Sequence, residues 1–131
     1  MISLDTNVLV RILVADDPKQ TRKATELIKL LDDSDEEAHV SDIVLCELVW
    51  VLGSGYGHDR DAIAAALARL LAARQLRFDS AENVFRALEA YENGKGDFAD
   101  YLIREHARSA GCDTVVTFDK KLLNEEMYST P

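Results

Sequence analysis

The sequence has few residues that could crosslink or interrupt the chain. Among 131 residues there are two cysteines, Cys46 and Cys112, and two prolines. The cysteines lack the spacing of a zinc site and lie in apolar surroundings, so we expect buried free thiols in a reducing compartment. No repeat, linker or low-complexity segment divides the sequence. We therefore expect residues 1–131 to form a single domain.

The sequence also lacks an excess of basic residues and a long apolar run. Its formal net charge is −9, which argues against a simple basic nucleic-acid-binding protein but leaves a nuclease possible, because acids can belong to a metal site. Solvated helix faces explain most of the early basic group, which comprises Arg11, Lys19, Arg22, Lys23 and Lys29. Without a membrane span or signal peptide, the protein is expected to be soluble and cytoplasmic, with no membrane partner.

Strand patterns alternate with helix patterns along the chain. A strand at residues 2–4 precedes a helix at 8–13, and Pro18 suits the first turn of a helix that ends near Leu31. The remaining expected elements are strands at residues 38–41, 76–79 and 114–117, and helices at 43–52, 60–73, 80–91 and 97–110. This alternation predicts an α/β fold, a three-layer α/β/α sandwich with a mainly parallel central sheet. The tail from Asn124 to Pro131 is only weakly strand-like.

Carboxylates recur where these strands end or where the next helices begin. Asp5 follows the first strand, Glu47 lies in the helix after the second, and Asp119 follows the last clear strand, while Asp97 and Asp100 open a helix. Sites in parallel sheets form beyond the carboxyl ends of strands, so one sheet edge is expected to gather these acids. Because clustered carboxylates repel one another, the pattern indicates a hard divalent cation.

Glu47 is the most informative of these acids. Its helix, from Ile43 to Leu52, is apolar on every face, which is typical of a buried helix. A buried glutamate needs a metal ion or an ion-pair partner, and Arg11 or Arg104 would serve as the partner. A functional role and a structural ion pair are both open at this position.

Each of the other acids also has a structural explanation. Asp97 suits a helix N-cap, and Asp100 suits the first helical turn or an ion pair with Arg104. Asp5 alone would serve as a helix cap, and Asp119 alone as an acidic turn residue. The coincidence of all four positions at one sheet edge favours a site.

The four islands together resemble the PIN-domain family, and within it the VapC-type toxins of toxin–antitoxin pairs. The resemblance covers essentially the whole chain and rests on Leu4-Asp5-Thr6-Asn7, Ser41 to Leu48, Gly96 to Ile103, and Val116-Thr117-Phe118-Asp119-Lys120. It implies an endoribonuclease, a hydrolase that cleaves RNA phosphodiester bonds with Mg²⁺ or Mn²⁺. The family's metal-binding and catalytic acids correspond to Asp5, Glu47, Asp100 and Asp119. Supporting roles correspond to Thr6, Asp97 and Thr117.

The resemblance also implies partners: an RNA substrate, a cognate antitoxin protein that occludes the acidic site, and a second copy of the chain in a homodimer. Other readings stay open. A non-catalytic PIN-like module would only bind a partner, and a receiver-like domain would need clearer strand–helix alternation. A haloacid-dehalogenase-like phosphatase would need a second aspartate where Asn7 stands.

Overall fold

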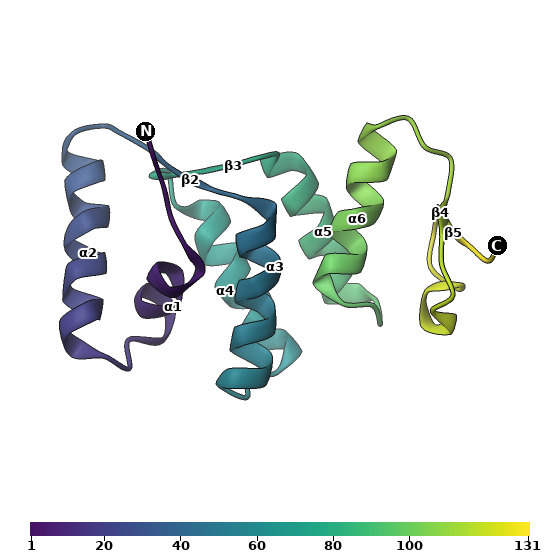
Figure 1. The fold of residues 1–131 in the computed structure, drawn as a ribbon, viewed down its shortest axis with the longest axis horizontal. Helices are drawn as coiled ribbons and strands as arrows, with labels where there is room; N and C mark the ends of the chain where they lie inside the picture. The colour runs from purple at the N-terminus through teal and green to yellow at the C-terminus, as the bar shows by residue number, and fades with distance from the viewer. The chain divides into compact units, whose positions relative to one another are not determined.

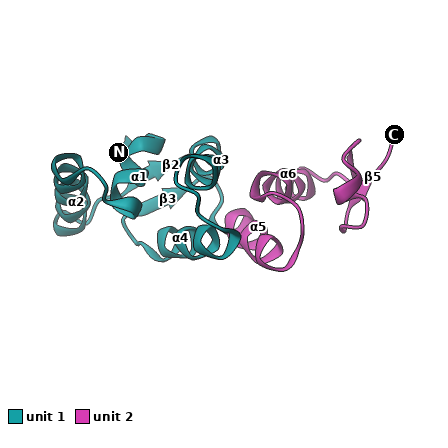
Figure 2. Ribbon diagram, turned by 90° about the horizontal axis from the view of Figure 1, so that it is seen from below, with its two compact units in different colours: residues 1–81 teal, residues 82–131 magenta.

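The structure is a computed structural model that describes residues 1–131. The chain forms two compact units, Met1–Ala81 and Glu82–Pro131, which Figure 2 distinguishes by colour. No helix in the structure combines the length and the apolar character that a bilayer crossing requires. The single domain expected over residues 1–131 stays a prediction.

Unit 1 contains a three-stranded parallel sheet and four helices (Figure 1). The strands are adjacent in the order β1-β2-β3, and Ser3 pairs in register with His39, as Val40 does with Phe78. Figure 2 shows these strands in the interior of the unit, with the helices around them. The elements run in chain order as β1 (Ile2–Ser3), α1 (Thr6–Val14), α2 (Pro18–Asp33), β2 (Ala38–Val40), α3 (Asp42–Trp50), a π-helical turn (Val51–Gly55), α4 (Arg60–Ala72) and β3 (Leu76–Phe78).

Short polar side chains fix where the helices of unit 1 begin. The Asp17 carboxylate accepts a hydrogen bond from the Gln20 backbone N–H at 3.0 Å, directly before Pro18 in the first turn of α2. The Ser41 hydroxyl accepts from the Val44 N–H at 3.2 Å at the start of α3. Such caps satisfy donors that have no partner inside the helix. Fully buried leucines hold the helices onto the sheet: Leu9, Leu45, Leu48, Leu52 and Leu67.

Unit 2 contains two helices and a two-stranded parallel sheet. Its elements are α5 (Ala81–Asn93, whose first residue belongs to unit 1), α6 (Phe98–Ser109), β4 (Val115–Val116), a 3₁₀ turn (Lys120–Leu122) and β5 (Tyr128–Ser129). Strands β4 and β5 pair in parallel. Gly111 follows α6 with a positive φ of 86°, as expected for the glycine after a helix end.

The predicted α/β class with parallel strands is confirmed, and two details differ. The strands form two separate sheets, one in each unit, and the gathering of all the acids at one sheet edge stays a prediction. The weakly strand-like tail does form a strand, β5.

The expectation of two buried thiols is wrong. Cys112 is exposed in the loop after α6, as are its neighbours at residues 108–114, whereas Cys46 is half-buried in α3. Burial raises the pKa of the Cys46 thiol above its usual value.

Candidate functional site

Asp5 stands at the junction between β1 and α1. It is the N-cap of α1, with an extended backbone, and its Oδ1 accepts a hydrogen bond from the Thr6 N–H at 2.7 Å. The carboxylate is exposed. The alternative that Asp5 serves as a helix cap is therefore correct, and it leaves the second carboxylate oxygen open to a ligand. Capping and ligand binding are compatible at this residue.

Thr6 connects Asp5 to Glu47. Its backbone N–H donates to Asp5, and its Oγ1 donates to Glu47 Oε2 at 3.0 Å, across 41 positions of sequence. The threonine itself is only 7% exposed. One buried residue at the start of α1 thus fixes two carboxylates of unit 1 relative to each other.

The expectation that Glu47 is buried is wrong. The glutamate is exposed, and Ile43 and Trp50 on the same face of α3 are 73% and 69% exposed. Spacings of four and three residues place these side chains on one helical face. The opposite face supplies the buried Leu45 and Leu48, so an apolar helix can still present one side to solvent. Glu47 also makes no ion pair with an arginine, contrary to the structural alternative.

A hydrogen-bonded chain at the end of the sheet fixes the start of α3. The Asp79 carboxylate bonds the His39 ring through Nε2 at 2.6 Å and accepts from the Asp42 backbone N–H at 3.0 Å. The His39 ring also lies 3.1 Å from the Ser3 hydroxyl. This chain ties the carboxyl ends of β1, β2 and β3 to the first turn of α3, and so helps to orient the helix that carries Glu47.

In unit 2, Asp97 and Asp100 form the start of α6. Asp97 is the N-cap, and its backbone N–H donates to Asp100 Oδ2 at 2.9 Å. The capping interpretation of Asp97 is therefore correct. Desolvation by burial raises the pKa of Asp100 above its ordinary value, and the nearby charges of Asp97 and Asp119 raise it further. These acids are close enough to repel one another, and a bound cation would relieve that repulsion.

Asp119 is held in the turn after β4. Its backbone N–H donates to Thr117 Oγ1 at 3.0 Å, and its own Oδ1 accepts from the Lys121 N–H at 3.0 Å. The Thr117 hydroxyl thus acts as an acceptor that orders this turn. As at Asp5, one carboxylate oxygen caps a helical turn while the other stays available.

Sequence reasoning missed the residues that brace the Asp97–Asp100 turn. The Tyr128 hydroxyl on β5 donates to the Asp100 carbonyl. The buried Tyr101 hydroxyl donates to Glu125 at 2.7 Å and accepts from the Gly96 N–H at 2.9 Å. No local pattern reveals these contacts, because their partners are up to 28 positions apart.

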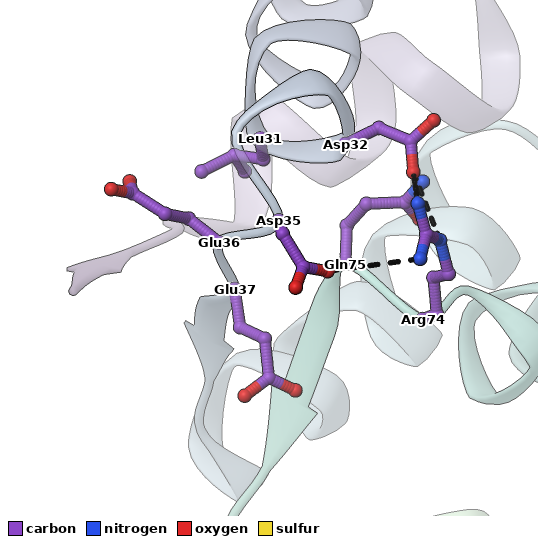
Figure 3. Close-up of a pocket in the computed structure, with 7 residues that line it drawn as sticks. All are labelled: Leu31, Asp32, Asp35, Glu36, Glu37, Arg74 and Gln75. Atoms are coloured by element: carbon purple, nitrogen blue, oxygen red, sulfur yellow. Dashed lines mark hydrogen bonds and ion pairs between the residues drawn. The ribbon is translucent and has the colours of Figure 1, made fainter.

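The pocket in Figure 3 is rich in acids, and its single arginine pairs with two of its four carboxylates. Arg74 bonds Asp32 through two guanidinium nitrogens and lies 3.8 Å from Asp35. The Arg74 hydrogen bond lowers the pKa of Asp32. The acids of this pocket come from the end of α2 and the loop to β2, away from the β1–α1 junction. We do not assign it as the candidate site.

Carboxylate oxygens are the ligands that Mg²⁺ prefers, and open carboxylate oxygens are available at Asp5 and Glu47 in unit 1 and at Asp100 and Asp119 in unit 2. The donor chemistry therefore suits the metal. No group of three or more His, Cys, Asp or Glu side chains is gathered closely enough to hold a metal ion. Each unit by itself presents an incomplete ligand set.

Comparison with known proteins identifies the fold family. The model of the PIN domain matches residues 2–125. The chain belongs to the PIN-domain family. This PIN domain is also 26% identical over 118 residues to a VapC ribonuclease of Aquifex aeolicus (strain VF5), covering 90% of the present chain and 87% of the relative. The resemblance to VapC-type PIN proteins, first drawn from the four sequence islands, is confirmed. Membership of this family also excludes the phosphatase and receiver-like alternatives, because those proteins have other folds.

Proposed function

We propose that this PIN domain is an endoribonuclease that depends on Mg²⁺ or Mn²⁺ and acts as the toxin of a toxin–antitoxin pair. In this proposal Asp5, Glu47, Asp100 and Asp119 hold the metal and carry the reaction. The observation that carries the proposal is the buried Thr6, which holds Asp5 and Glu47 as a pair while each keeps an open oxygen. Membership of the family and the likeness to a VapC ribonuclease support it.

Each residue has a role that follows from its contacts. Asp5 binds with the oxygen that does not cap α1, so its position is fixed by the helix itself. Thr6 holds Oε2 of Glu47, which leaves Oε1 to accept a hydrogen bond from the attacking water and orient it. The chemistry that the metal ion supplies when bound is stabilisation of the charge that develops on the phosphoryl oxygens.

Asp100 and Asp119 complete the set from unit 2, and Asp97 and Thr117 support them. The hydrogen bond to the Asp97 N–H orients Asp100, and the Thr117 hydroxyl orders the turn that carries Asp119. The raised pKa of Asp100 supports this role, because a carboxylate that is desolvated by burial and lies near the charges of Asp97 and Asp119 gains from a cation.

The proposal includes a protein partner. An antitoxin that inserts a basic side chain among these acids would neutralise them as a metal ion does, and the net charge of −9 favours such a partner. We also propose a homodimer in the cytoplasm. Co-expression with a small DNA-binding protein encoded beside the gene, followed by co-purification and loss of RNA cleavage, would test the pairing.

RNA cleavage by Asp5→Asn tests the enzyme assignment directly. Asparagine caps a helix as well as aspartate, so α1 is retained while a charged ligand is lost. We expect cleavage of single-stranded RNA in Mg²⁺ to fall roughly 100-fold or more. Asp17→Asn is the matched control, because Asp17 is likewise an N-cap aspartate, that of α2, and it should cleave as the parent does.

Three outcomes contradict the proposal in different ways. Equal cleavage by the parent and Asp5→Asn would remove Asp5 from the site. Cleavage that persists after chelation of divalent ions would show that the reaction does not depend on a metal ion. A folded parent that cleaves no RNA with either ion would favour the non-catalytic binding module.

A further inference from the structure

A pocket between α1 and α2 is lined by cations, although the molecule as a whole is acidic. Its volume is about 300 Å³, close to the lower end for small-molecule sites. Two cations and two amides line it together with apolar side chains, and no carboxylate does. The chain as a whole has a net charge of −9, and the pocket of Figure 3 is lined by four carboxylates. The lining residues are Asn7, Val8, Arg11, Gln20, Lys23, Ala24 and Leu27.

Hydrogen bonds hold the Arg11 side chain in place and leave one of its guanidinium nitrogens without a partner. Its Nε donates to Gln20 Oε1 at 2.6 Å, and its Nη1 donates to Asp16 at 3.1 Å and to the Tyr56 hydroxyl at 3.3 Å. The hydrogen bond with Tyr56 and the charge of Asp16 raise the pKa of Arg11 further. The guanidinium is therefore fixed and charged, while its Nη2 has no partner within the chain. A fixed planar donor of this kind suits a phosphate group.

Lys23 and Asn7 add two more open donors. Neither side chain makes a hydrogen bond or ion pair in the structure, and both are exposed. With Arg11 they present an ammonium group, an amide and a guanidinium nitrogen at one pocket. Phosphodiester oxygens only accept hydrogen bonds and carry negative charge, so they match this set of donors.

The pocket also lies next to the proposed catalytic residues. Asn7 is two positions after Asp5, and Arg11 is one helical turn further along α1. At 1.5 Å per residue, Arg11 lies about 9 Å along the helix axis from Asp5. Asp5 and Arg11 are further apart than this axial distance, because 3.6 residues per turn place them on different sides of α1. Neighbouring phosphates of one strand are likewise further apart than the axial rise of about 3.4 Å per nucleotide, because the backbone winds around its axis. The path from Asp5 to the pocket is therefore a few nucleotides long. A strand whose scissile phosphate lies at Asp5 would therefore carry a neighbouring phosphate to the pocket.

We propose that the α1–α2 pocket binds a backbone phosphate of the RNA strand, a few nucleotides from the cleaved bond. The inference rests on the proposed ribonuclease function and adds the path of the substrate to it. The pocket carries no base-reading element in this role, so its contribution is independent of sequence. It compensates for the repulsion between RNA and the acids of the site.

The first test compares two lysines of α2. Lys23→Ala removes a cation from the pocket, whereas Lys29→Ala removes one from the same helix outside it. Both are exposed, so neither substitution should unfold the protein. Binding of single-stranded RNA is measured by fluorescence anisotropy over a range of salt concentrations. The protein background is Asp5→Asn, in which cleavage is expected to be roughly 100-fold slower or more.

We expect Lys23→Ala to bind RNA roughly three- to tenfold more weakly at low salt, with the slope of log K against log salt reduced by about 0.7. Lys29→Ala should leave the RNA affinity and the salt slope unchanged. A second test uses RNA with one phosphate replaced by an uncharged methylphosphonate. Replacement at a position a few nucleotides from the cleavage site should abolish the difference between parent and Lys23→Ala, and replacement elsewhere should preserve it.

The failures of the two proposals are distinguishable. Equal salt slopes for Lys23→Ala and Lys29→Ala, in a protein whose parent cleaves RNA, would overturn the pocket and leave the ribonuclease intact. Loss of antitoxin binding by Lys23→Ala, with RNA affinity unchanged, would assign the pocket to a protein partner and also overturn the inference. Absence of both binding and cleavage in the parent would refute both proposals.

Discussion

The hydrogen bond between Thr6 and Glu47 makes a quantitative prediction. Thr6 Oγ1 donates to Glu47 Oε2 at 3.0 Å. Thr6→Val removes the donor and keeps the shape of this buried side chain. A hydrogen bond to a charged group contributes about 1.5–3 kcal/mol when it is buried. Because Glu47 is exposed and water can replace the lost donor, we expect less than this range, about 1 kcal/mol, as for a typical hydrogen bond.

The expected effects on stability and activity follow from that value. Loss of about 1 kcal/mol in a chain of this size lowers Tm by roughly 3–5 °C. If the bond also holds Glu47 in its productive orientation, kcat should fall roughly fivefold, since 1.4 kcal/mol corresponds to a factor of ten. Thr6→Ser is the control, because it keeps the hydroxyl and loses a buried methyl group. It should lose a similar amount of stability and retain kcat.

A double-mutant cycle isolates the interaction. Thr6→Val is measured by urea denaturation in the parent and in Glu47→Ala, where the acceptor is absent. We expect Thr6→Val to lower the free energy of unfolding in the parent but not in Glu47→Ala, which gives a coupling energy of about 1 kcal/mol. Thr6→Ser should show no coupling with Glu47→Ala. Equal costs of Thr6→Val in both backgrounds would refute the link, and an unchanged kcat would refute its role in orienting Glu47.

Three further predictions concern unit 2 and the metal. In metal-free protein, Asp100→Asn should be stabilising, and its advantage should grow as pH rises above about 4. The raised pKa means that the folded state of the parent binds the proton more tightly and loses stability as that proton leaves. A pH-independent difference in urea denaturation would contradict this. Gly94→Ala should lower stability by about 1–3 kcal/mol, because its Cβ would lie 2.8 Å from Tyr101 Cζ and 2.9 Å from the Ala90 carbonyl. Gly53→Ala, whose Cβ would meet only an ordinary contact at 3.6 Å, is the control, and equal thermal stability of the two variants would refute the packing argument. Mn²⁺ at about 100 times its Kd should stabilise the parent by about 2.7 kcal/mol, reversibly with chelator, and no thermal shift would argue against a metal site.

The local sequence predicts where the elements begin because capping acts within a few residues. Asp5 caps α1 as expected, and a helix expected at residues 60–73 forms at Arg60–Ala72. The placement of Asp97 and Asp100 at the start of a helix follows from the same short-range chemistry. These features depend on neighbours three or four positions away, which the sequence displays directly.

The exposure of α3 could not be predicted in this way. Composition identifies the helix as apolar, but which face it buries depends on where the sheet and α1 lie. Leu45 and Leu48 meet the core, and Ile43 and Trp50 do not. The inference that Glu47 is buried failed for this reason, although its assignment as a candidate ligand does not depend on burial.

The sequence by itself determined the fold class, the helix caps and the identity of the carboxylates, because these depend on residue type and short spacing. Only the tertiary structure brought Thr6 to Glu47, Tyr128 to Asp100 and Arg11 to the pocket that Lys23 lines. Each of these contacts joins residues from different elements. Chain topology and side-chain packing decide such contacts, and neither can be read from a local pattern of residues.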